Sequence, residues 1–519
     1  MHTHIRSGAI VGVEGLLVDV EVDIARGLPT FSIVGLPNTA VRESRERVTA
    51  AIRNAGWKVP LERITVNLAP GDIRKEGSAY DLAIAAGILI ASSQCRAGRG
   101  ASNTMLLGEL ALDGSLRRIP GVLPLLIHAR ARGVERAVVP LVNLDEARVV
   151  DGVEVTGVSN LRFAMRVLSG SDACGGYGAG ADDESIVVKR RDESIDPPGA
   201  NASTIDMRDV RGQGAVKRAL LVAAAGGHHV LMIGPPGSGK TMLARRFADI
   251  VPALSRQAAL ETTMIYSTVG RLNGQGLIRR PPLRAPHHSA SDAGLIGGGN
   301  APRPGEVTLA HNGVLFLDEL PEFHRNVLET LREPLEEGHI TISRARSAVT
   351  FPAQFQLVAA MNPCPCGYRG SRDQACRCGP RQREHYLARV SGPLLDRISI
   401  QVRVYPVDPD AFATKSTGES SDGLRAQAER AREVARKRSP RANGGNARVP
   451  ESEFVASVTL APAAEEYLTH ACRRLRISAR GRSHVLRVAR TIADLEQSRA
   501  VCDGHIAEAL QYRLSDGLA

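Results

Sequence analysis

The sequence contains no apolar run of the roughly 18 residues that a membrane-spanning helix needs. Its opening stretch, MHTHIRSGAIVGVEGLLVDVEV, places charged residues within the apolar segment and so lacks the unbroken apolar core of a signal peptide. Tryptophan occurs once, and a composition of 43% hydrophobic and 23% charged residues has no bias towards a fibrous or wholly disordered chain. We therefore expect a soluble, cytoplasmic, α/β-rich protein without membrane partners.

The length and charge of the chain narrow this expectation further. A chain of 519 residues is too long for one hydrophobic core and should form two or three domains. The net charge of +11 favours a polyanionic partner such as nucleic acid, although a generally basic, arginine-rich proteome would give the same balance. In a reducing cytoplasm, clustered cysteines are expected to be metal ligands or free thiols rather than disulfides.

Changes of pattern along the chain predict its domains. Residues 1–168 alternate short apolar strands with helical stretches, and residues 169–204 have the Gly, Ser, Asp and Pro content of a flexible linker. Residues 205–407 show the strand, glycine-rich turn and helix of a second α/β domain. Residues 408–450 form a basic connecting segment with one helical part, and residues 451–519 have the periodicity of a small helical domain.

The second domain contains a phosphate-binding motif. After an apolar strand, the chain reads Gly-x-x-x-x-Gly-Lys-Thr and continues as an amphipathic helix. Glycines let backbone N–H groups surround phosphate oxygens, Lys240 is expected to reach the β and γ phosphates, and Thr241 to bind Mg²⁺. The predicted nucleotide-binding residues are Gly234, Pro235, Pro236, Gly237, Ser238, Gly239, Lys240 and Thr241.

Two later strands supply the remaining groups for hydrolysis. The apolar strand in GVLFLDEL ends in Asp318 and Glu319. Asp318 would complete the Mg²⁺ shell and Glu319 would polarise the attacking water, because phosphoryl transfer depends on positioning and charge neutralisation. The strand in FQLVAAMNP ends at Asn362, which is placed to orient that water.

These blocks resemble AAA+ ATPases of the clade that includes magnesium chelatase ATPase subunits and MCM helicases, and more closely the ComM/YifB family of magnesium chelatase-like proteins. The resemblance covers nearly the whole chain, through VGLPNTAVRESRERV, ITVNLAPGDIRKEGSAYDLA, GGHHVLMIGPPGSGKT, RAPHHSASDAGLIGGG, GVLFLDELPEF and SGPLLDRI. It implies a P-loop ATPase domain with a helical lid, the cofactors ATP and Mg²⁺, and a ring, expected to be a homohexamer. It also places Gln213, in DVRGQ, near the adenine.

The resemblance assigns three further roles. Asn362 corresponds to sensor 1, Arg397 to an arginine finger that reaches the γ-phosphate of a neighbouring subunit, and Arg480 to sensor 2, a role for which Arg487 competes. The family commonly has an Asp two residues after the finger, whereas this chain has Ser399. That difference removes a local acidic partner but leaves the finger in place.

Two insertions are candidates for contact with DNA. GHITISRARSAVTFPAQFQLV predicts a hairpin with Arg344 and Arg346 at its tip. In the clade that this chain resembles, a hairpin before sensor 1 faces the ring pore and follows DNA, and paired arginines suit contact with phosphates. The alternative is an exposed hairpin with solubilising charges. The glycine-rich insertion that contains His287 and His288 is expected to be another pore loop.

The first domain resembles the Lon protease catalytic fold, which uses a Ser nucleophile and a Lys base. Aligning the turn at Gly77 puts Ala79 at the nucleophile position, with Ser78 one residue away. The segment that should hold the base reads IPGVLPLL and has no lysine. Without a base there is no activated nucleophile, so we expect a Lon-like scaffold without peptidase activity.

Two Cys-x-Cys-Gly sequences follow Asn362. Cys364, Cys366, Cys376 and Cys378 could provide four thiolates to a tetrahedral structural Zn²⁺. Reduced thiols without a metal and redox chemistry are the alternatives.

Taken together, these features predict an ATP-hydrolysing ring motor that acts on single-stranded or branched DNA, as a helicase or branch-migration factor in homologous recombination or DNA uptake. The alternatives are a magnesium chelatase-type ATPase subunit and an ATP-dependent protease of Lon type. The missing Ser and Lys oppose the protease.

Overall fold

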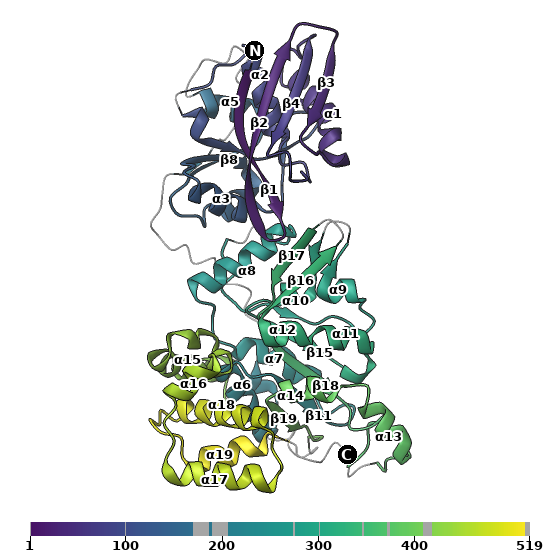
Figure 1. Cartoon of the computed structure of the whole chain (residues 1–519), viewed down its shortest axis with the longest axis vertical. Helices are drawn as coiled ribbons and strands as arrows, with labels where there is room; N and C mark the ends of the chain where they lie inside the picture. Colours follow the sequence, from purple (N-terminus) through teal and green to yellow (C-terminus); the bar gives the residue numbers. More distant parts are fainter. Residues whose placement is uncertain are drawn as a thin grey trace. The chain divides into compact units, whose positions relative to one another are not determined.

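The computed structural model describes residues 2–98, 100–169, 186–188, 206–272, 276–299, 302–344, 347–370, 374–407 and 418–513 (Figure 1). The chain divides into two compact units, Met1–Ala200 with Leu260–Ile278, and Asn201–Ala259 with Arg279–Ala519. The division departs from the ranges expected from sequence, because residues 260–278 of the ATPase region fold with the first unit. Among the described residues, there is no helix with the length and apolarity needed to span a bilayer.

An eight-stranded mixed sheet forms the centre of the first unit, in the order β10-β9-β8-β5-β1-β2-β4-β3. Alternating apolar residues put one face of β2 into the core, with Val18, Val20 and Val22 fully buried. The strands are β1 His2–Val11, β2 Glu14–Ala25, β3 Thr30–Val34, β4 Arg63–Ala69, β5 Thr104–Leu106, β8 Arg136–Pro140, β9 Glu154–Val158 and β10 Ile186–Val188. β10 falls inside the expected linker and pairs with β9; the rest of that linker, apart from Ser169, lies outside the described residues.

Helices and a segment from later in the chain complete the first unit. The helices are α1 Thr39–Asn54, α2 Asp81–Ala91, α3 Val122–Ala131, α4 Leu144–Ala147 and α5 Leu161–Ser169. α2 is almost entirely apolar and is buried against β1 and β2, as its composition requires. From the segment 260–278, Met264 packs on the cluster that includes Leu123 and Leu126, and the Ser267 carbonyl accepts from the N–H of Gly121 at 2.9 Å.

The second unit is built on a five-stranded parallel sheet in the order β12-β15-β18-β11-β19. All residues of β11, β15 and β18 are buried, which explains why these strands read as continuous apolar runs. The strands are β11 Val230–Ile233, β12 Leu283–Arg284, β15 Val314–Leu317, β18 Gln356–Met361 and β19 Ile400–Arg403. Because they are parallel, their carboxyl ends lie at one edge of the sheet, where α/β proteins bind ligands.

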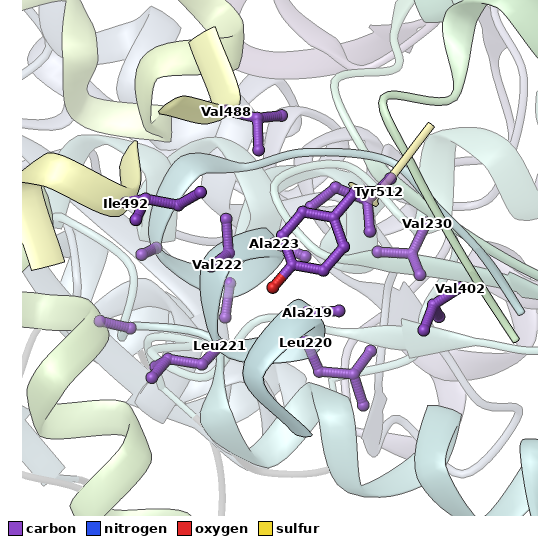
Figure 2. Close-up of a cluster of buried hydrophobic side chains, with 14 of the residues drawn as sticks. Ala219, Leu220, Leu221, Val222, Ala223, Val230, Val402, Val488, Ile492 and Tyr512 are labelled. Atoms are coloured by element: carbon purple, nitrogen blue, oxygen red, sulfur yellow. The ribbon is translucent and has the colours of Figure 1, made fainter. Parts of the chain in front are cut away.

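Helices on the sheet and in the lid share a core. Figure 2 shows Ala219, Leu220 and Val222 of α6 grouped with side chains from the sheet and from α18. Burial of each such Leu or Val is worth about 1.5–3 kcal/mol. The helices of this unit are α6 Gly214–Gly226, α7 Lys240–Ile250, α9 Asp292–Ile296, α10 Glu306–Leu309, α11 Arg325–Thr330, α12 Arg332–Glu337, α13 Pro380–Leu387, α14 Gly392–Arg397, α15 Ser421–Arg438, α16 Glu451–Ser457, α17 Pro462–Arg474, α18 Ala479–Leu495 and α19 Asp503–Gln511. α8 Arg256–Thr268 belongs to the first unit from Leu260 onward.

The basic segment expected to connect two domains is instead part of this core. In α15, Leu424, Ala428, Ala431 and Ala435 are buried, and the helix packs on α6 and α18. Their spacing of three or four residues forms one apolar face, while the arginines lie mostly on the other. The high charge of the segment concealed this narrow apolar face. Residues 408–417 of the segment lie outside the described residues.

The predicted hairpin before β18 is confirmed. β16 His339–Arg344 pairs with β17 Ser347–Pro352 in antiparallel register, with Arg344 opposite Ser347. One face is packed, since Ile340, Ile342 and Phe351 are buried. Arg344 lies at the end of its strand, and Arg346 lies outside the described residues.

Candidate nucleotide-binding site

The phosphate-binding motif connects β11 to the first turn of α7. Gly237 has φ +76° and Gly239 has φ +88°, the left-handed conformation that glycine adopts without strain. Gly239 precedes Lys240, the first residue of α7, so the helix begins where the loop closes. This loop and helix N-terminus form the arrangement that binds phosphate through backbone N–H groups.

A cavity of about 460 Å³ lies beside this loop. Its walls come from the loop and from the carboxyl ends of β15 and β18, which are neighbours in the sheet. The lining residues are Pro236, Gly237, Gly239, Lys240, Thr241, Met242, Asp318, Glu319, Met361 and Asn362. The three motifs predicted from the sequence, namely the phosphate loop, the acidic pair after β15 and Asn362 after β18, therefore line the same cavity.

Lys240 is 9% exposed and is held by oxygen atoms of the loop. Its Nζ donates to the carbonyls of Gly234 at 2.8 Å and Pro235 at 2.9 Å, and to Asn362 Oδ1 at 3.2 Å. Burial lowers the pKa of Lys240, and the nearby Asp318 and Glu319 act in the opposite direction. An incoming phosphate anion would supply the charge partner that this buried amine needs.

Thr241 and Asp318 provide the oxygen atoms expected for Mg²⁺. Thr241 Oγ1 donates to Asp318 Oδ2 at 2.5 Å, and Asp318 Oδ1 accepts from the backbone N–H of Glu319 at 3.0 Å. A hydroxyl and a carboxylate fit the preference of Mg²⁺ for one or two protein oxygens together with phosphate and water. These residues would hold the ion, which neutralises phosphate charge when it is bound.

Glu319 has an unusual backbone and an unexpected neighbour. Its φ is +52°, a left-handed conformation that costs a non-glycine residue energy and occurs preferentially at functional sites. Its side chain is 55% exposed, and His288 Nδ1 lies 3.6 Å from Glu319 Oε2. From the sequence, His288 could suggest metal ligation, but a role in a pore loop is preferred. His288 and Glu319 are far apart in the sequence, so their contact could not be predicted from either motif.

Asn362 lies between Lys240 and Tyr386. Its side-chain oxygen accepts from Lys240, and its backbone lies near the hydroxyl of Tyr386. Burial is the main cause that raises the pKa of Tyr386 to about 12, so this hydroxyl stays protonated at neutral pH. Tyr386 belongs to α13 and carries no motif that could have revealed its place.

Neither Arg397 nor Arg480 is among the residues that line the cavity. Arg397 is 7% exposed, and both Arg397 and Arg480 pair with Glu336 Oε1. Arg487, the other candidate for sensor 2, instead donates at 2.7 Å to the carbonyls of Asn446 and Val449. Such bonds give Arg487 a structural role within the lid, whereas the side chain of Arg480 is 50% exposed.

Two other positions singled out in the sequence have clear partners. Gln213 Nε2 donates to the carbonyl of Tyr405, and Gln213 is not among the residues that line the cavity. Ser399, which stands where the family pattern has Asp, shares a 2.8 Å hydrogen bond with His484 Nδ1. Ser399 thereby links the strand end near Arg397 to α18.

The four cysteines after Asn362 come together. Cys364 Sγ lies 3.4 Å from Cys366 Sγ, and Cys376 Sγ lies 3.6 Å from both. Cys378 Sγ accepts from the backbone N–H of Cys366 at 3.3 Å, and all four sulfurs lie within 4.8 Å of one another. A tetrahedral zinc site with Zn–S bonds of about 2.3 Å has sulfurs about 3.8 Å apart. The donor set and its spacing therefore fit Zn²⁺.

The Lon-like region of the first unit lacks a serine–lysine pair at the expected place. Ser78 Oγ donates to the carboxylate of Glu109, and Lys75 Nζ donates to the carbonyl of Pro70. Ser78 thus has a carboxylate partner, and the absence of peptidase activity stays a prediction.

A phosphate loop, two acidic residues and an asparagine at the ends of adjacent parallel strands, together with a helical lid, define a P-loop ATPase domain of the AAA+ class. Three family models match the chain: "Magnesium chelatase, subunit ChlI" over residues 206–412, "Subunit ChlI of Mg-chelatase" over residues 20–143, and "Magnesium chelatase, subunit ChlI C-terminal" over residues 418–513.

Full-length relatives define the family more closely. The chain is 42% identical over 517 residues to the uncharacterized protein YifB of Escherichia coli, covering 99% of this chain and 97% of that protein. It is 42% identical over 511 residues to the competence protein ComM of Haemophilus influenzae, covering 98% and 96%. A shorter match, 32% identical over 181 residues, covers 30% of this chain and 33% of Lon protease 2 of Bacillus subtilis. The chain belongs to the ComM/YifB family of magnesium chelatase-like AAA+ ATPases, with a Lon-like first domain.

Proposed function

We propose that the protein is an ATP-dependent DNA motor, with helicase or branch-migration activity in recombination or DNA uptake. ATP with Mg²⁺ would bind at Lys240, Thr241 and Asp318, and Glu319 would polarise the attacking water. Arg344 and Arg346 would contact the phosphates of single-stranded or branched DNA. The name of one relative, competence protein ComM, and the net charge of +11 are consistent with this proposal.

The observation that supports a motor most directly is the continuity between the hairpin and the nucleotide site. β17 is followed closely by β18, and β18 ends next to Asn362, whose side chain accepts from Lys240. β18 is central and fully buried, so a shift at Asn362 on nucleotide turnover would be passed to a rigid strand and from there to the hairpin. This path offers a mechanical route from hydrolysis to an arginine-bearing tip.

The proposal includes a ring in which Arg397 reaches the nucleotide of a neighbouring subunit. Arg397 pairs with Glu336 and does not line the cavity of its own subunit, and this supports a role in trans for Arg397. Arg480, the proposed sensor 2, pairs with the same carboxylate. A homohexamer would bring such a finger to each site.

A magnesium chelatase-type ATPase subunit is the second candidate, because the matching family models carry that description. A chelatase subunit would hydrolyse ATP without a requirement for DNA. DNA stimulation of hydrolysis therefore distinguishes the two.

The four cysteines are proposed to hold one structural zinc ion per chain. Their mutual spacing fits a closed four-thiolate shell, which leaves no open position for catalysis.

The decisive experiment measures ATP hydrolysis without DNA and with single-stranded, duplex and branched DNA, together with strand displacement. The variant Arg344→Ala/Arg346→Ala should keep basal hydrolysis and lose most of the DNA stimulation and displacement. Arg473→Ala/Arg474→Ala removes the same charge from the exposed end of α17 and serves as the control. Hydrolysis that is indifferent to every DNA, with rings confirmed by sizing, would exclude the DNA motor.

A further inference from the structure

The loop that holds the four cysteines touches the phosphate loop. A Cβ built on Gly367 would lie 2.5 Å from Pro236 Cδ and 2.8 Å from Pro236 Cγ, closer than any real side chain could approach. Gly367 has φ +86° and closes a turn through its N–H to the carbonyl of Cys364 at 2.9 Å. Glycine is therefore required twice at this position, for the backbone conformation and for the close packing.

The other end of the cysteine loop leads to a second contact with the same site. Gly379 follows Cys378 and precedes α13, whose Tyr386 is 6% exposed and lies near the backbone of Asn362. The start of the loop is fixed as well, because the N–H of Gly234 donates to the carbonyl of Met361 at 3.2 Å. The loop thus begins at Met361 and Asn362, which line the nucleotide cavity, and it leads into the helix that carries Tyr386.

The conformation of this loop depends on its sulfur atoms. The described residues between β18 and α13 form no helix or strand. Cys364 is fully buried, and the N–H of Cys366 donates to a sulfur, that of Cys378. A metal bound by four such sulfurs would join the two Cys-x-Cys pairs and fix the turn at Gly367 between them and the phosphate loop.

We propose that the four-cysteine loop is a zinc-dependent brace for the phosphate loop, in which the turn at Gly367 holds Pro236 and so sets the affinity of the subunit for nucleotide. The brace rests on the zinc site proposed above and gives that site a role in the ATPase. It requires no contact between subunits or with DNA.

The first test compares zinc content with nucleotide affinity in the full-length protein. Elemental analysis should find one zinc per chain in the wild type and none in Cys376→Ser/Cys378→Ser. The dissociation constant for mant-ATP, followed by fluorescence, should rise about tenfold in that variant. Removing zinc from the wild type with a chelator should weaken binding equally, and added Zn²⁺ should restore it, which separates loss of the metal from misfolding of the variant.

The second test separates the contact from the metal. Gly367→Ala should retain one zinc per chain but bind mant-ATP several-fold more weakly. Gly370→Ala is a matched control in the same loop, because Gly370 has φ +75° but nothing lies within 4 Å of its added Cβ. It should bind zinc and mant-ATP like the wild type.

The outcomes are distinguishable. A wild-type protein that contains no zinc and gains no affinity from added Zn²⁺ would overturn both the zinc site and the brace. Normal mant-ATP affinity in the zinc-free variant, or equal effects of Gly367→Ala and Gly370→Ala, would overturn the brace alone. Failure of DNA stimulation would reject the DNA motor and leave the brace standing.

Discussion

Arg397 and Arg480 pair with the same oxygen atom, Glu336 Oε1. The two guanidinium groups come from α14 and from the first turns of α18, and the carboxylate comes from α12. One acidic side chain therefore contacts both the proposed arginine finger and the proposed sensor 2. The two guanidinium groups repel each other, and the negative charge of Glu336 between them offsets this repulsion.

Glu336→Gln should lower the melting temperature by a few degrees and reduce ATP hydrolysis. The expected loss of stability is about 1 kcal/mol, because the Glu336 side chain is 40% exposed and solvent screens the pairs.

The pH dependence of this effect follows from the pKa of Glu336. The hydrogen bond from Arg397 is the largest cause that lowers this pKa from its ordinary value of 4.5. The stabilisation is therefore present above pH 4.5 and is lost as the pH falls through the lowered pKa. Melting curves from pH 8 to pH 3 should show the difference between variant and wild type shrinking below pH 4.5. Glu333→Gln, in the same helix, is the control; an equal loss in both variants would contradict the prediction.

Lys240→Ala should abolish binding of ATP, whereas Glu319→Gln should bind ATP and hydrolyse it about 10²–10⁴-fold more slowly. The first change removes the buried positive charge at the phosphates, and the second removes only the group that polarises water. Mant-ATP binding and phosphate release measure the two steps. Glu322→Gln, close by and paired with Arg389, should hydrolyse ATP almost normally. Wild-type turnover by Glu319→Gln would show that the general base is another residue.

Arg397→Ala should spare ATP binding and remove most turnover. Mixing it with Glu319→Gln should restore some hydrolysis, because shared rings then contain sites with an intact glutamate that face an intact arginine. Hydrolysis is measured across mixing ratios after subunit exchange, with ring size checked by light scattering. Arg389→Ala, a nearby exposed arginine, is the control and should remain active alone. The absence of rescue at every ratio in confirmed mixed rings would argue against a finger in trans.

Asp494→Ala should destabilise the second unit by about 3–5 kcal/mol. Asp494 is 1% exposed and pairs with Arg438 at 2.7 Å and Arg490 at 3.0 Å, so its removal leaves two poorly hydrated charges without their partner. Thermal melting of the nucleotide-free protein would report the loss. Glu433→Ala breaks an exposed pair with Lys437 and should change the melting temperature by less than a degree or two. Similar melting of Asp494→Ala and wild type would mean that the buried pairs contribute little.

Features that depend only on neighbouring residues in the chain could be predicted from the sequence. The phosphate loop, the strand before Asp318 and the hairpin before β18 each need only local glycines or apolar periodicity to be recognised. Lys240, Thr241, Asp318, Glu319 and Asn362 line one cavity, as the order of the motifs suggested.

Contacts between distant segments could not be predicted in this way. Glu336 and His288 are ordinary polar residues in the sequence, and their importance comes from the side chains that the fold brings beside them. The closeness of Gly367 to Pro236 likewise joins two segments that are far apart in the sequence. α15 was misjudged because its alanine face is narrow and its overall charge is high.

Because residues 260–278 fold with the first unit, the protein cannot be cut into two intact fragments at a single point of the chain. Thr262, Thr263 and Ile265 are buried, and Arg118 donates to the carbonyl of Leu272 within that unit. A fragment cut at residue 206 would expose this segment without its partners, and a fragment that stops at residue 200 would lose part of its own packing. Neither half is therefore a self-contained module, and exchange of the Lon-like part between relatives by simple recombination at the junction would leave both products incomplete.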